Sequence, residues 1–328
     1  MFKIKGDVIV KNLHKLLFAM LIVIGLAAGC NNEPEEEQTD EAIEETEDNS
    51  HFPVTVEDSE GNEITLEEAP ENIVSLMPSN TEIAFALGLG DQIVGVSDHD
   101  NYPEEVEEKE KVGDLELNIE RILSLEPDLV LAQPGNDMDG IEQLQDSGLD
   151  VFVVNDATSI EETYESIEMI SEVTGTVEEG EELIEDMEEG FAELREKAEE
   201  ISEDEQKTVY IEISPEPEIY SPGQYTFEDE MLSLIHAENS MSDEEGWVQL
   251  NEEAVIEMNP DVIILTYDHV EDPIEEVMSR DGWQDIDAVN DEQVFQVDTD
   301  IVSRPGPRLV EGAEAFAKEI YPDVFSES

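Results

Sequence analysis

The chain has 328 residues, of which 89 are acidic and only 14 are basic, so that its formal net charge at pH 7 is -75. This charge excludes a protein that holds nucleic acid on a basic surface, because contacts to phosphates require lysine and arginine. The length is sufficient for two medium-sized domains. The carboxylates are spread over the whole chain, which favours a solvated surface suited to salt or alkaline surroundings over a single acidic patch for a partner.

The first 29 residues have the pattern of a signal peptide. Four lysines precede an apolar run from Leu16 to Gly29, which is shorter than the ~20 residues of a membrane-spanning helix. The only cysteine, Cys30, follows this run directly. It resembles the lipobox of bacterial lipoproteins, whose cysteine is acylated and becomes residue one after cleavage. This implies a lipid anchor on the extracytoplasmic face of the cell membrane; the alternative is a plain secretory signal with an incidental cysteine. Neither leaves a second cysteine for an internal disulfide or thiol catalysis.

Residues 30–51 are rich in carboxylates and contain one large aliphatic residue, Ile43. Such a segment cannot bury enough apolar surface to fold, and its charges repel one another. We therefore expect an acidic tether, with a reach of ~65 Å at ~3.3 Å per residue.

Residues 52–175 predict a first lobe in which strands alternate with helices. The expected elements are a hairpin over residues 54–66, strands from residues 72, 92 and 149, and helices from residues 81 and 140. Strands that alternate with helices along the chain predict a parallel sheet.

One segment of this lobe recurs further along the chain. Leu117, Asn118, Glu120, Pro127 and Asp128 return, with the same spacing, as Leu250, Asn251, Glu253, Pro260 and Asp261. Each copy predicts a helix, a Pro-Asp turn and an apolar strand that is buried on both faces. The duplication indicates two similar α/β lobes, and a cleft between lobes is where small ligands usually bind.

Between the two copies, residues 176–203 carry their apolar residues along one stripe of a helix, as Met187, Phe191 and Leu194 illustrate. We expect this helix to join the lobes as a rigid strut that permits modest lobe movement on ligand binding. Residues 204–328 then form the second lobe, which repeats the alternation of strands and helices and closes with a helix from Pro307 to Ile320.

Sequence patterns of catalytic sites are missing from this chain. No serine-nucleophile elbow, phosphate-binding loop, zinc-protease helix or dinucleotide-binding glycine pattern occurs, so we expect a protein that is not an enzyme. His99 and His269 each follow a predicted strand, one in each lobe, and the carboxyl ends of parallel strands face the ligand crevice. A transition-metal site needs two or three histidines with converging carboxylates, to which these two histidines could contribute; we expect instead that each is a loop histidine near solvent and that no metal is bound.

Aromatic residues in predicted loops are candidates for stacking on a flat ligand. These residues are Tyr102, Tyr220, Tyr225, Trp247 and Tyr267. Trp247 is the strongest candidate, and each of the others is better explained by packing within its loop.

Two arginines follow the last predicted strand. Arg304 is placed to donate hydrogen bonds into the cleft. Arg308 lies in the first turn of a helix, where the macrodipole disfavours a cation, and we expect it to be a surface or lobe-stabilising residue.

From Phe52 to Pro322 the chain resembles the vitamin B12 and iron-siderophore binding proteins of bacterial ABC importers. The similarity is strongest in the segments IVSLMPSNTEIAFALGLGDQIVGVSDHDNYP, VGDLELNIERILSLEPDLVLA and SRPGPRLVEGAEAFAKEIYP, and it is closest to the vitamin B12 binders. The resemblance implies two α/β lobes joined by one long helix, a monomer without a cofactor, and a permease with its ATPase as partners.

The resemblance also implies functional positions. His99 and Gln133 stand where the B12 binders have cleft aromatics, whereas Trp247, Asp300 and Arg304 keep a cleft tryptophan and a polar pair. With Tyr225 and Tyr267, these are the expected ligand-binding residues. A further hypothesis brings His99 to cobalt or to a haem iron, with Met77 as a second haem ligand.

The family docks on its permease through one acidic residue on each lobe. Glu82 matches the first of these positions. The second aligns with Ser233 in the B12 binders and lies nearer Glu230 in related proteins, and we expect Glu230.

Three interpretations of the function remain open. The first is delivery of a corrinoid to an ABC importer, and the second is delivery of a ferric siderophore or haem by the same architecture. The third is an enzyme or adhesin built on this scaffold. The negative charge favours the first over an anionic catecholate complex, because cobalamin is close to neutral.

Overall fold

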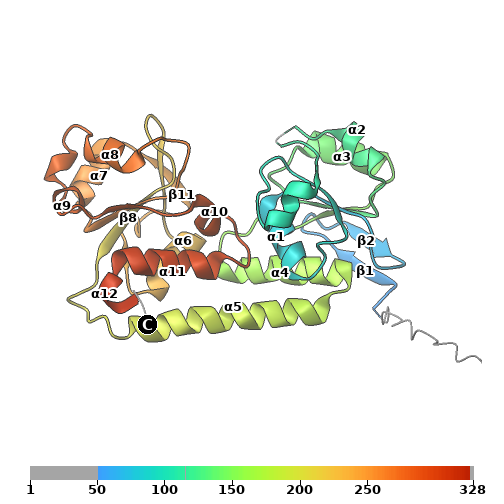
Figure 1. Cartoon of the computed structure of the whole chain (residues 1–328), viewed down its shortest axis with the longest axis horizontal. Helices are drawn as coiled ribbons and strands as arrows, with labels where there is room; N and C mark the ends of the chain where they lie inside the picture. Colours follow the sequence, from blue (N-terminus) through green and yellow to red (C-terminus); the bar gives the residue numbers. More distant parts are fainter. Residues whose placement is uncertain (1–50, 115, 326–328) are drawn as a thin grey trace, which may run out of the picture. The chain divides into compact units, whose positions relative to one another are not determined.

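The computed structural model describes residues 51–114 and 116–325. The expected signal peptide, Cys30 and nearly all of the tether lie outside these residues. Within the described part of the chain, no helix is long and apolar enough to cross a membrane. The fold is α/β with two lobes that each contain a parallel sheet, as predicted, and a long helix runs beneath both (Figure 1).

The first lobe is built on a five-stranded parallel sheet with the strand order β5-β4-β3-β6-β7. Its strands are β3 (Ile73–Ser75), β4 (Ile93–Val96), β5 (Glu110–Lys111), β6 (Leu129–Ala132) and β7 (Val151–Val153). The helices are α1 (Pro78–Ala86), the 3-10 helix η1 (Glu104–Glu108), α2 (Ile119–Ser124), α3 (Met138–Asp146) and α4 (Ile160–Thr174). The predicted hairpin is present as the antiparallel pair β1 (Val54–Glu57) and β2 (Glu63–Leu66).

The second lobe has a four-stranded parallel sheet with the order β10-β8-β12-β13. Its strands are β8 (Thr208–Glu212), β10 (Glu238–Asn239), β12 (Val262–Leu265) and β13 (Val294–Gln296). The helical segments are α6 (Phe227–Leu234), α7 (Glu252–Met258), α8 (Pro273–Met278), η2 (Trp283–Asp285), α9 (Asp287–Asn290), α10 (Thr299–Ser303), α11 (Leu309–Ile320) and α12 (Pro322–Phe325).

The loops expected around Tyr220 and Trp247 are instead strands. Tyr220 lies in β9 (Ile219–Pro222) and Trp247 begins β11 (Trp247–Leu250), and the two strands pair antiparallel. Both strands are only four residues long, and β11 is exposed at Trp247 and Gln249, so the pair lacks the continuous apolar run by which a central strand is recognised. The prediction of loops at these two positions was therefore wrong.

The sequence repeat corresponds to a repeated structural unit. Asn118 and Asn251 cap α2 and α7, where their side-chain oxygens accept hydrogen bonds from the backbone N–H groups of Arg121 and Ala254. Asp128 and Asp261 directly precede the central strands β6 and β12. Asp128 accepts hydrogen bonds from the N–H groups of residues 71 and 72 ahead of β3, and Asp261 accepts one from the N–H of residue 208 in β8. The repeated residues therefore start helices and fix neighbouring strands.

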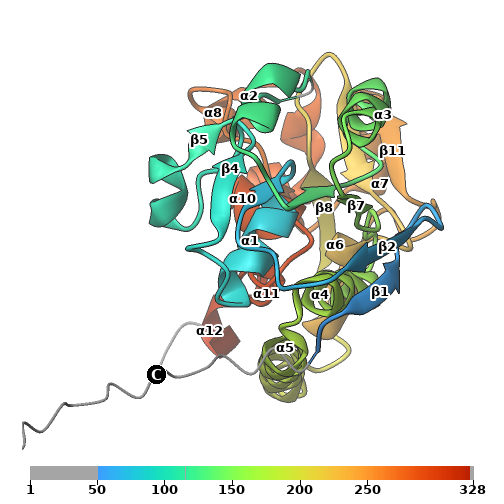
Figure 2. The same cartoon turned by 90° about the vertical axis from the view of Figure 1, so that its right-hand side faces the viewer.

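The helix predicted over residues 176–203 is present as α5 (Val177–Ala198). It ends earlier than expected, and the backbone N–H groups of residues 199, 200 and 201 bond to carbonyl oxygens three residues back instead of four. Figure 2 looks along α4 and α5, which pack against each other. Further along, α5 packs on α11, and Gly190 makes this approach possible, since a Cβ there would lie 2.6 Å from a methyl group of Val310.

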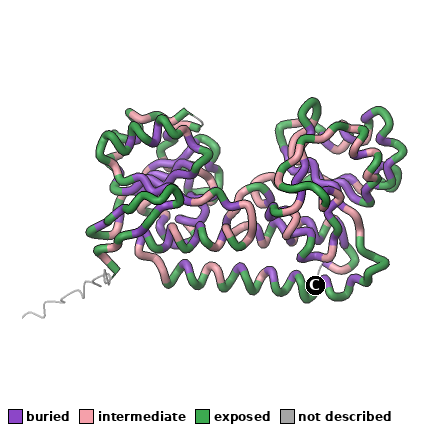
Figure 3. Tube along the Cα trace, turned by 180° about the vertical axis from the view of Figure 1, so that it is seen from behind, coloured by how far each residue is buried: buried purple, intermediate pink, exposed green. Residues whose placement is uncertain are grey.

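One apolar core extends through both lobes. It contains Ile73 and Phe152 of the first lobe, Phe191 of α5, and Ile264 and Phe316 of the second lobe. Figure 3 shows the buried strands above α5. In α5 itself, buried and exposed residues alternate along the helix. A shared core opposes free rotation of one lobe against the other, and modest lobe movement on ligand binding stays a prediction.

Candidate functional site

A cavity of about 420 Å³ opens at the carboxyl ends of the strands of the first lobe. Its walls include Leu76 and Met77 after β3, Ser97 and His99 after β4, Gln133 and Asn136 after β6, and Asp156 after β7. From the second lobe, Asp300, Ser303 and Arg304 complete the lining. Strand ends in open α/β sheets are the usual place of ligand sites, and the two lobes meet at this one.

The imidazole of His99 is available to a ligand in this cavity. The main chain of His99 is held in place, since its N–H donates to Ser97 Oγ at 3.3 Å and its carbonyl oxygen accepts from Arg304 Nη2 at 3.3 Å. The hydrogen bonds found among the described residues do not involve its ring, and the residue is exposed.

The next residue, Asp100, is buried and fixes this loop. It accepts a hydrogen bond from Ser97 Oγ at 2.6 Å, and its carbonyl oxygen accepts one from Lys111 Nζ at 2.6 Å. Burial raises the pKa of the Asp100 carboxyl above its ordinary value.

Gln133 faces the cavity but is engaged within the lobe. Its side-chain amide donates to Ser79 Oγ at 3.2 Å, and its backbone N–H donates to Asn136 Oδ1 at 2.8 Å. Asn136 in turn donates to the carbonyl oxygen of Leu76 at 3.1 Å. This network joins the ends of β3 and β6, so that Gln133 shapes the cavity wall with only 3% of its surface exposed.

Three of the expected ligand-binding aromatics lie outside this cavity. Tyr267 is buried, and its hydroxyl donates to Glu212 Oε1 at 2.8 Å. Tyr225 is 66% exposed and borders a separate surface pocket. Trp247 is 41% exposed, and its indole N–H donates to Glu228 Oε1 at 3.2 Å. Of these three, Trp247 and Tyr225 offer accessible ring surface.

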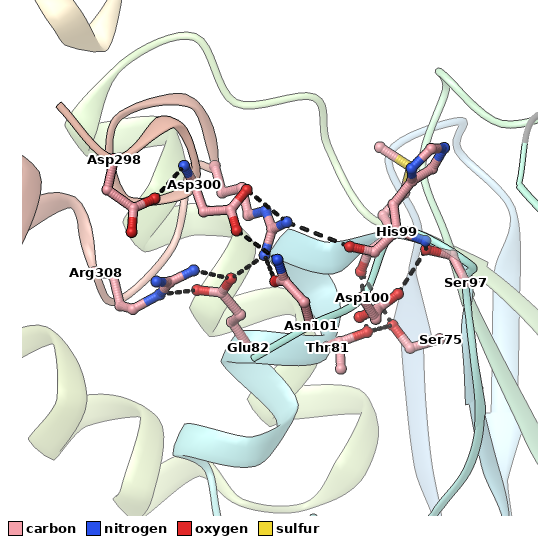
Figure 4. Close-up of polar contacts among 12 residues, drawn as sticks. Ser75, Thr81, Glu82, Ser97, His99, Asp100, Asn101, Asp298, Asp300 and Arg308 are labelled. Carbon is pink, nitrogen blue, oxygen red and sulfur yellow. Dashed lines mark hydrogen bonds and ion pairs between the residues drawn. The ribbon is translucent and has the colours of Figure 1, made fainter. Parts of the chain in front are cut away.

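Glu82, the expected docking acid of the first lobe, lies against the second lobe. Its side chain is 2% exposed. Arg304 Nη1 donates to Oε1 at 2.9 Å, and Arg308 donates through Nη2 to Oε1 at 2.6 Å and through Nε to Oε2 at 2.8 Å (Figure 4). Burial by itself lowers the pKa of Arg308, but the hydrogen bonds and charge of Glu82 raise it above its ordinary value, so this arginine stays charged.

Asp300 and Arg304 form the expected polar pair, and both bond to the first lobe. Arg304 Nη2 lies 2.7 Å from Asp300 Oδ1. Asn101, after β4, donates to Asp300 Oδ2 at 2.7 Å and accepts from Arg304 Nη1 at 2.8 Å. Most of the N–H groups of Arg304 are thus already engaged, which limits the donation into the cleft expected from the sequence.

The second expected docking acid, Glu230 of α6, borders another cavity of about 640 Å³ between α4, α5 and α6. Its carboxylate accepts a hydrogen bond from the N–H of Ile160 at 2.7 Å, and burial raises its pKa above the ordinary value. This cavity lies away from the strand ends, and we regard the cavity at His99 as the candidate ligand site.

The lining of the candidate site is acidic. It contains Asp114, Asp156 and Asp300, with Arg304 as its single basic residue. Among the described residues, no group of three or more histidine, cysteine or acidic side chains is placed to hold a metal ion. Asp114, Asn136 and Asp156 were not predicted as lining residues, although the rule that ligands bind at the carboxyl ends of strands applies to Asn136 and Asp156 as well.

Comparisons with known proteins agree with this fold. The family model described as periplasmic binding protein matches residues 73–301. An uncharacterized ABC transporter substrate-binding lipoprotein, YvrC, of Bacillus subtilis (strain 168) is 47% identical over 312 residues, which cover 94% of this chain and 97% of that protein. A vitamin B12-binding protein of Pectobacterium carotovorum subsp. carotovorum (strain PC1) is 32% identical over 254 residues, 76% of this chain and 88% of that protein.

Among solved structures, a possible iron-binding (periplasmic solute-binding) protein from Staphylococcus epidermidis ATCC 12228 superposes with a TM-score of 0.70. It is 36% identical, and the match covers 77% of this chain and 99% of that one. The chain therefore belongs to the family of periplasmic binding proteins, which are substrate-binding proteins of transporters and not enzymes.

Proposed function

We propose that the protein captures cobalamin or a related corrinoid between its lobes and delivers it to an ABC permease and its ATPase. The observation that carries the choice of ligand is the acidic cavity, in which Asp114 and Asp156 face a single cation, Arg304, whose guanidinium is already paired. Such walls repel an anion and accept a neutral ligand with hydrogen-bond donors, such as the amide side chains of a corrinoid. The similarity to a vitamin B12-binding protein supports the same choice.

A corrinoid is larger than the cavity in this structure, so its ring must extend towards the second lobe. We propose that His99 contacts the corrinoid within the cavity, and that the exposed ring of Trp247 stacks on the part that extends beyond it. Replacement Trp247→Ala is then expected to weaken binding by ~1 kcal/mol, and an unchanged affinity would remove Trp247 from the site.

The second candidate is an iron complex, and the similarity to a possible iron-binding protein favours it. Haem and catecholate complexes carry negative groups that need free cations, which this cavity does not offer. Hydroxamate complexes are neutral or cationic, so they are the iron ligands that its charge permits.

Calorimetric titration of the full-length lipoprotein with cyanocobalamin, ferrichrome and haem tests the assignment. We expect heat of binding with cyanocobalamin. Tight ferrichrome binding together with no response to cyanocobalamin would reverse the order of the two candidates.

The double variant Asp114→Asn, Asp156→Asn tests whether the charges of the cavity exclude anionic ligands. It should bind anionic ferric complexes more tightly than the parent does, with little change for cyanocobalamin. The matched control is Asp139→Asn, Asp146→Asn, which removes two exposed charges from α3, outside the cavity lining. An equal gain in both variants would mean that net charge matters and the cavity does not.

We further propose that acylated Cys30 anchors the protein to the extracytoplasmic face of the cell membrane, and that Glu82 and Glu230 meet basic residues of the permease. The name of the Bacillus relative as a lipoprotein supports the anchor. Replacement Cys30→Ser should abolish incorporation of labelled fatty acid into the protein, and incorporation into this variant equal to that of the parent would contradict the lipid anchor.

A further inference from the structure

Glu82, the acid proposed for permease docking, already forms ion pairs with Arg304 and Arg308 of the same chain. Arg308 donates hydrogen bonds to both carboxylate oxygens of Glu82 at 2.6 and 2.8 Å, and Arg304 donates a third at 2.9 Å. The side chains of Arg308 and Arg304 are only 11% and 13% exposed. Because water is largely excluded, dissolved salt screens these ion pairs weakly.

The position of Arg308 shows that Glu82 provides its main compensation. Arg308 is the N-cap residue of α11, where the positive end of the helix dipole opposes a cation. Its guanidinium lies 4.1 Å from the ring centre of Tyr102, which belongs to the first lobe. The hydrogen bonds and the ring contact of Arg308 thus reach across to the other lobe, while the charges of Asp298 and Asp300 attract it from its own lobe.

A second set of bonds lies directly beside the ligand cavity. Asn101 bonds to both Asp300 and Arg304, and the His99 carbonyl oxygen accepts from Arg304. His99, Asp300 and Arg304 also line the cavity. A ligand that takes hydrogen bonds from these groups competes with the contacts between the lobes.

We propose that Glu82, Asn101, Asp300, Arg304 and Arg308 form an interlobe latch that keeps the empty protein from docking. The latch holds Glu82 out of reach of a permease arginine until a ligand loosens the contacts of Arg304 and Asp300. Two guanidinium groups donate three hydrogen bonds to Glu82, whose side chain is only 2% exposed, so a third guanidinium reaches this carboxylate only by displacing one of them. This inference rests on the proposed function, since it assigns a regulator to the proposed docking acid.

Labelling of carboxyl groups tests the latch without a permease. The full-length protein is treated with a carbodiimide and a small amine, and modification of Glu82 is measured by mass spectrometry. We expect slow labelling of Glu82 in the empty parent, and faster labelling both in Arg308→Gln and after addition of cyanocobalamin. The control is Lys318→Gln, which removes an exposed cation from the same helix and should leave Glu82 protected.

Docking is measured with the lipoprotein and the permease–ATPase complex reconstituted in nanodiscs. Without ligand, Arg308→Gln should bind the complex at least about fivefold more tightly than the parent, within the usual range of coupling between sites. The Glu82→Gln variant should bind weakly, and the double variant should behave like Glu82→Gln.

The outcomes separate the latch from the proposed function. Equal labelling of Glu82 in the parent and in Arg308→Gln, or no gain in docking from Arg308→Gln, overturns the latch. Unchanged docking of Glu82→Gln instead removes the proposed docking role of Glu82. A lack of cobalamin binding would remove the ligand assignment. The comparison of the parent with Arg308→Gln in the absence of ligand would still test the latch.

Discussion

A buried ion pair in the second lobe allows a stability prediction with a defined magnitude. Glu212 at the end of β8 is fully buried and accepts from Arg280 at 2.7 and 2.8 Å. The side chain of Arg280 is 3% exposed, and its guanidinium lies 4.5 Å from the ring centre of Trp283. Burial alone lowers the pKa of Arg280, but its bonds to Glu212 and Glu276 raise it above the ordinary value, so the charge persists.

Replacement Arg280→Met leaves the Glu212 carboxylate buried without a counter-charge. Removal of one partner from a buried pair usually lowers the free energy of unfolding by about 3–5 kcal/mol. The hydroxyl of Tyr267 still donates to Glu212, which favours the lower end of this range. The double variant Glu212→Gln, Arg280→Met removes both charges and should be less destabilised than Arg280→Met alone, because the unpaired charge is the main source of the loss.

Urea unfolding followed by tryptophan emission measures this loss, since both tryptophans of the chain, Trp247 and Trp283, lie in the second lobe. The control is Arg121→Met, whose ion pair with Glu110 is exposed at 46% and 49% and should contribute less than about 1 kcal/mol. If Arg280→Met lost no more than this control, or if the double variant lost as much as the single one, the argument from desolvation would be refuted.

Three further predictions concern pH, backbone conformation and salt. Burial raises the pKa of Glu228 from 4.5 to about 7. Between these pH values the folded protein binds more protons than the unfolded chain, so its free energy of unfolding falls as the pH rises. The variant Glu228→Gln should lose about 3 kcal/mol less between pH 4.5 and 8, at 1.36 kcal/mol for each pKa unit, as measured by urea unfolding at the two pH values. Gly175 and Gly148 both have positive φ, but a Cβ at Gly175 would lie 2.5 Å from the ring of Phe52, whereas a Cβ at Gly148 would meet no atom within 4 Å. Thermal unfolding should therefore show a larger loss of stability for Gly175→Ala than for Gly148→Ala, which itself costs about 1 kcal/mol. Because a net charge of -75 repels itself and salt screens this repulsion, the unfolding temperature should rise between 0.01 and about 0.5 M sodium chloride, and a flat response would show that the charges are already neutralised.

Local signals in the sequence predicted most of the fold. Asn118 and Asn251 cap the repeated helices, and each central strand is a four-residue apolar run with every residue buried. These features depend on neighbours within a few residues, which a single sequence displays. The pair β9-β11 was missed because its strands are partly polar and gain their partners from residues far apart in the chain.

The site was predicted only in part, for a related reason. The rule that ligands bind at strand carboxyl ends brought out His99, whose ring proved accessible, and the resemblance placed Asp300 and Arg304 beside it. Tyr267 satisfied the same rule, yet its hydroxyl is bonded to Glu212 within the lobe. The sequence shows which residues follow the carboxyl end of a strand. It does not show which distant side chain each of these residues contacts in the folded protein.

The sequence by itself determined the duplicated lobes, the joining helix and the overall negative charge, because periodicity and composition are properties of the chain. The tertiary structure decided that Glu82 is enclosed by Arg304 and Arg308, more than 200 residues away, with contacts separated by 222 and 226 positions. Ion pairs between the lobes depend on how the two lobes pack against each other. The residues next to a charged side chain in the sequence do not show which distant residue it pairs with.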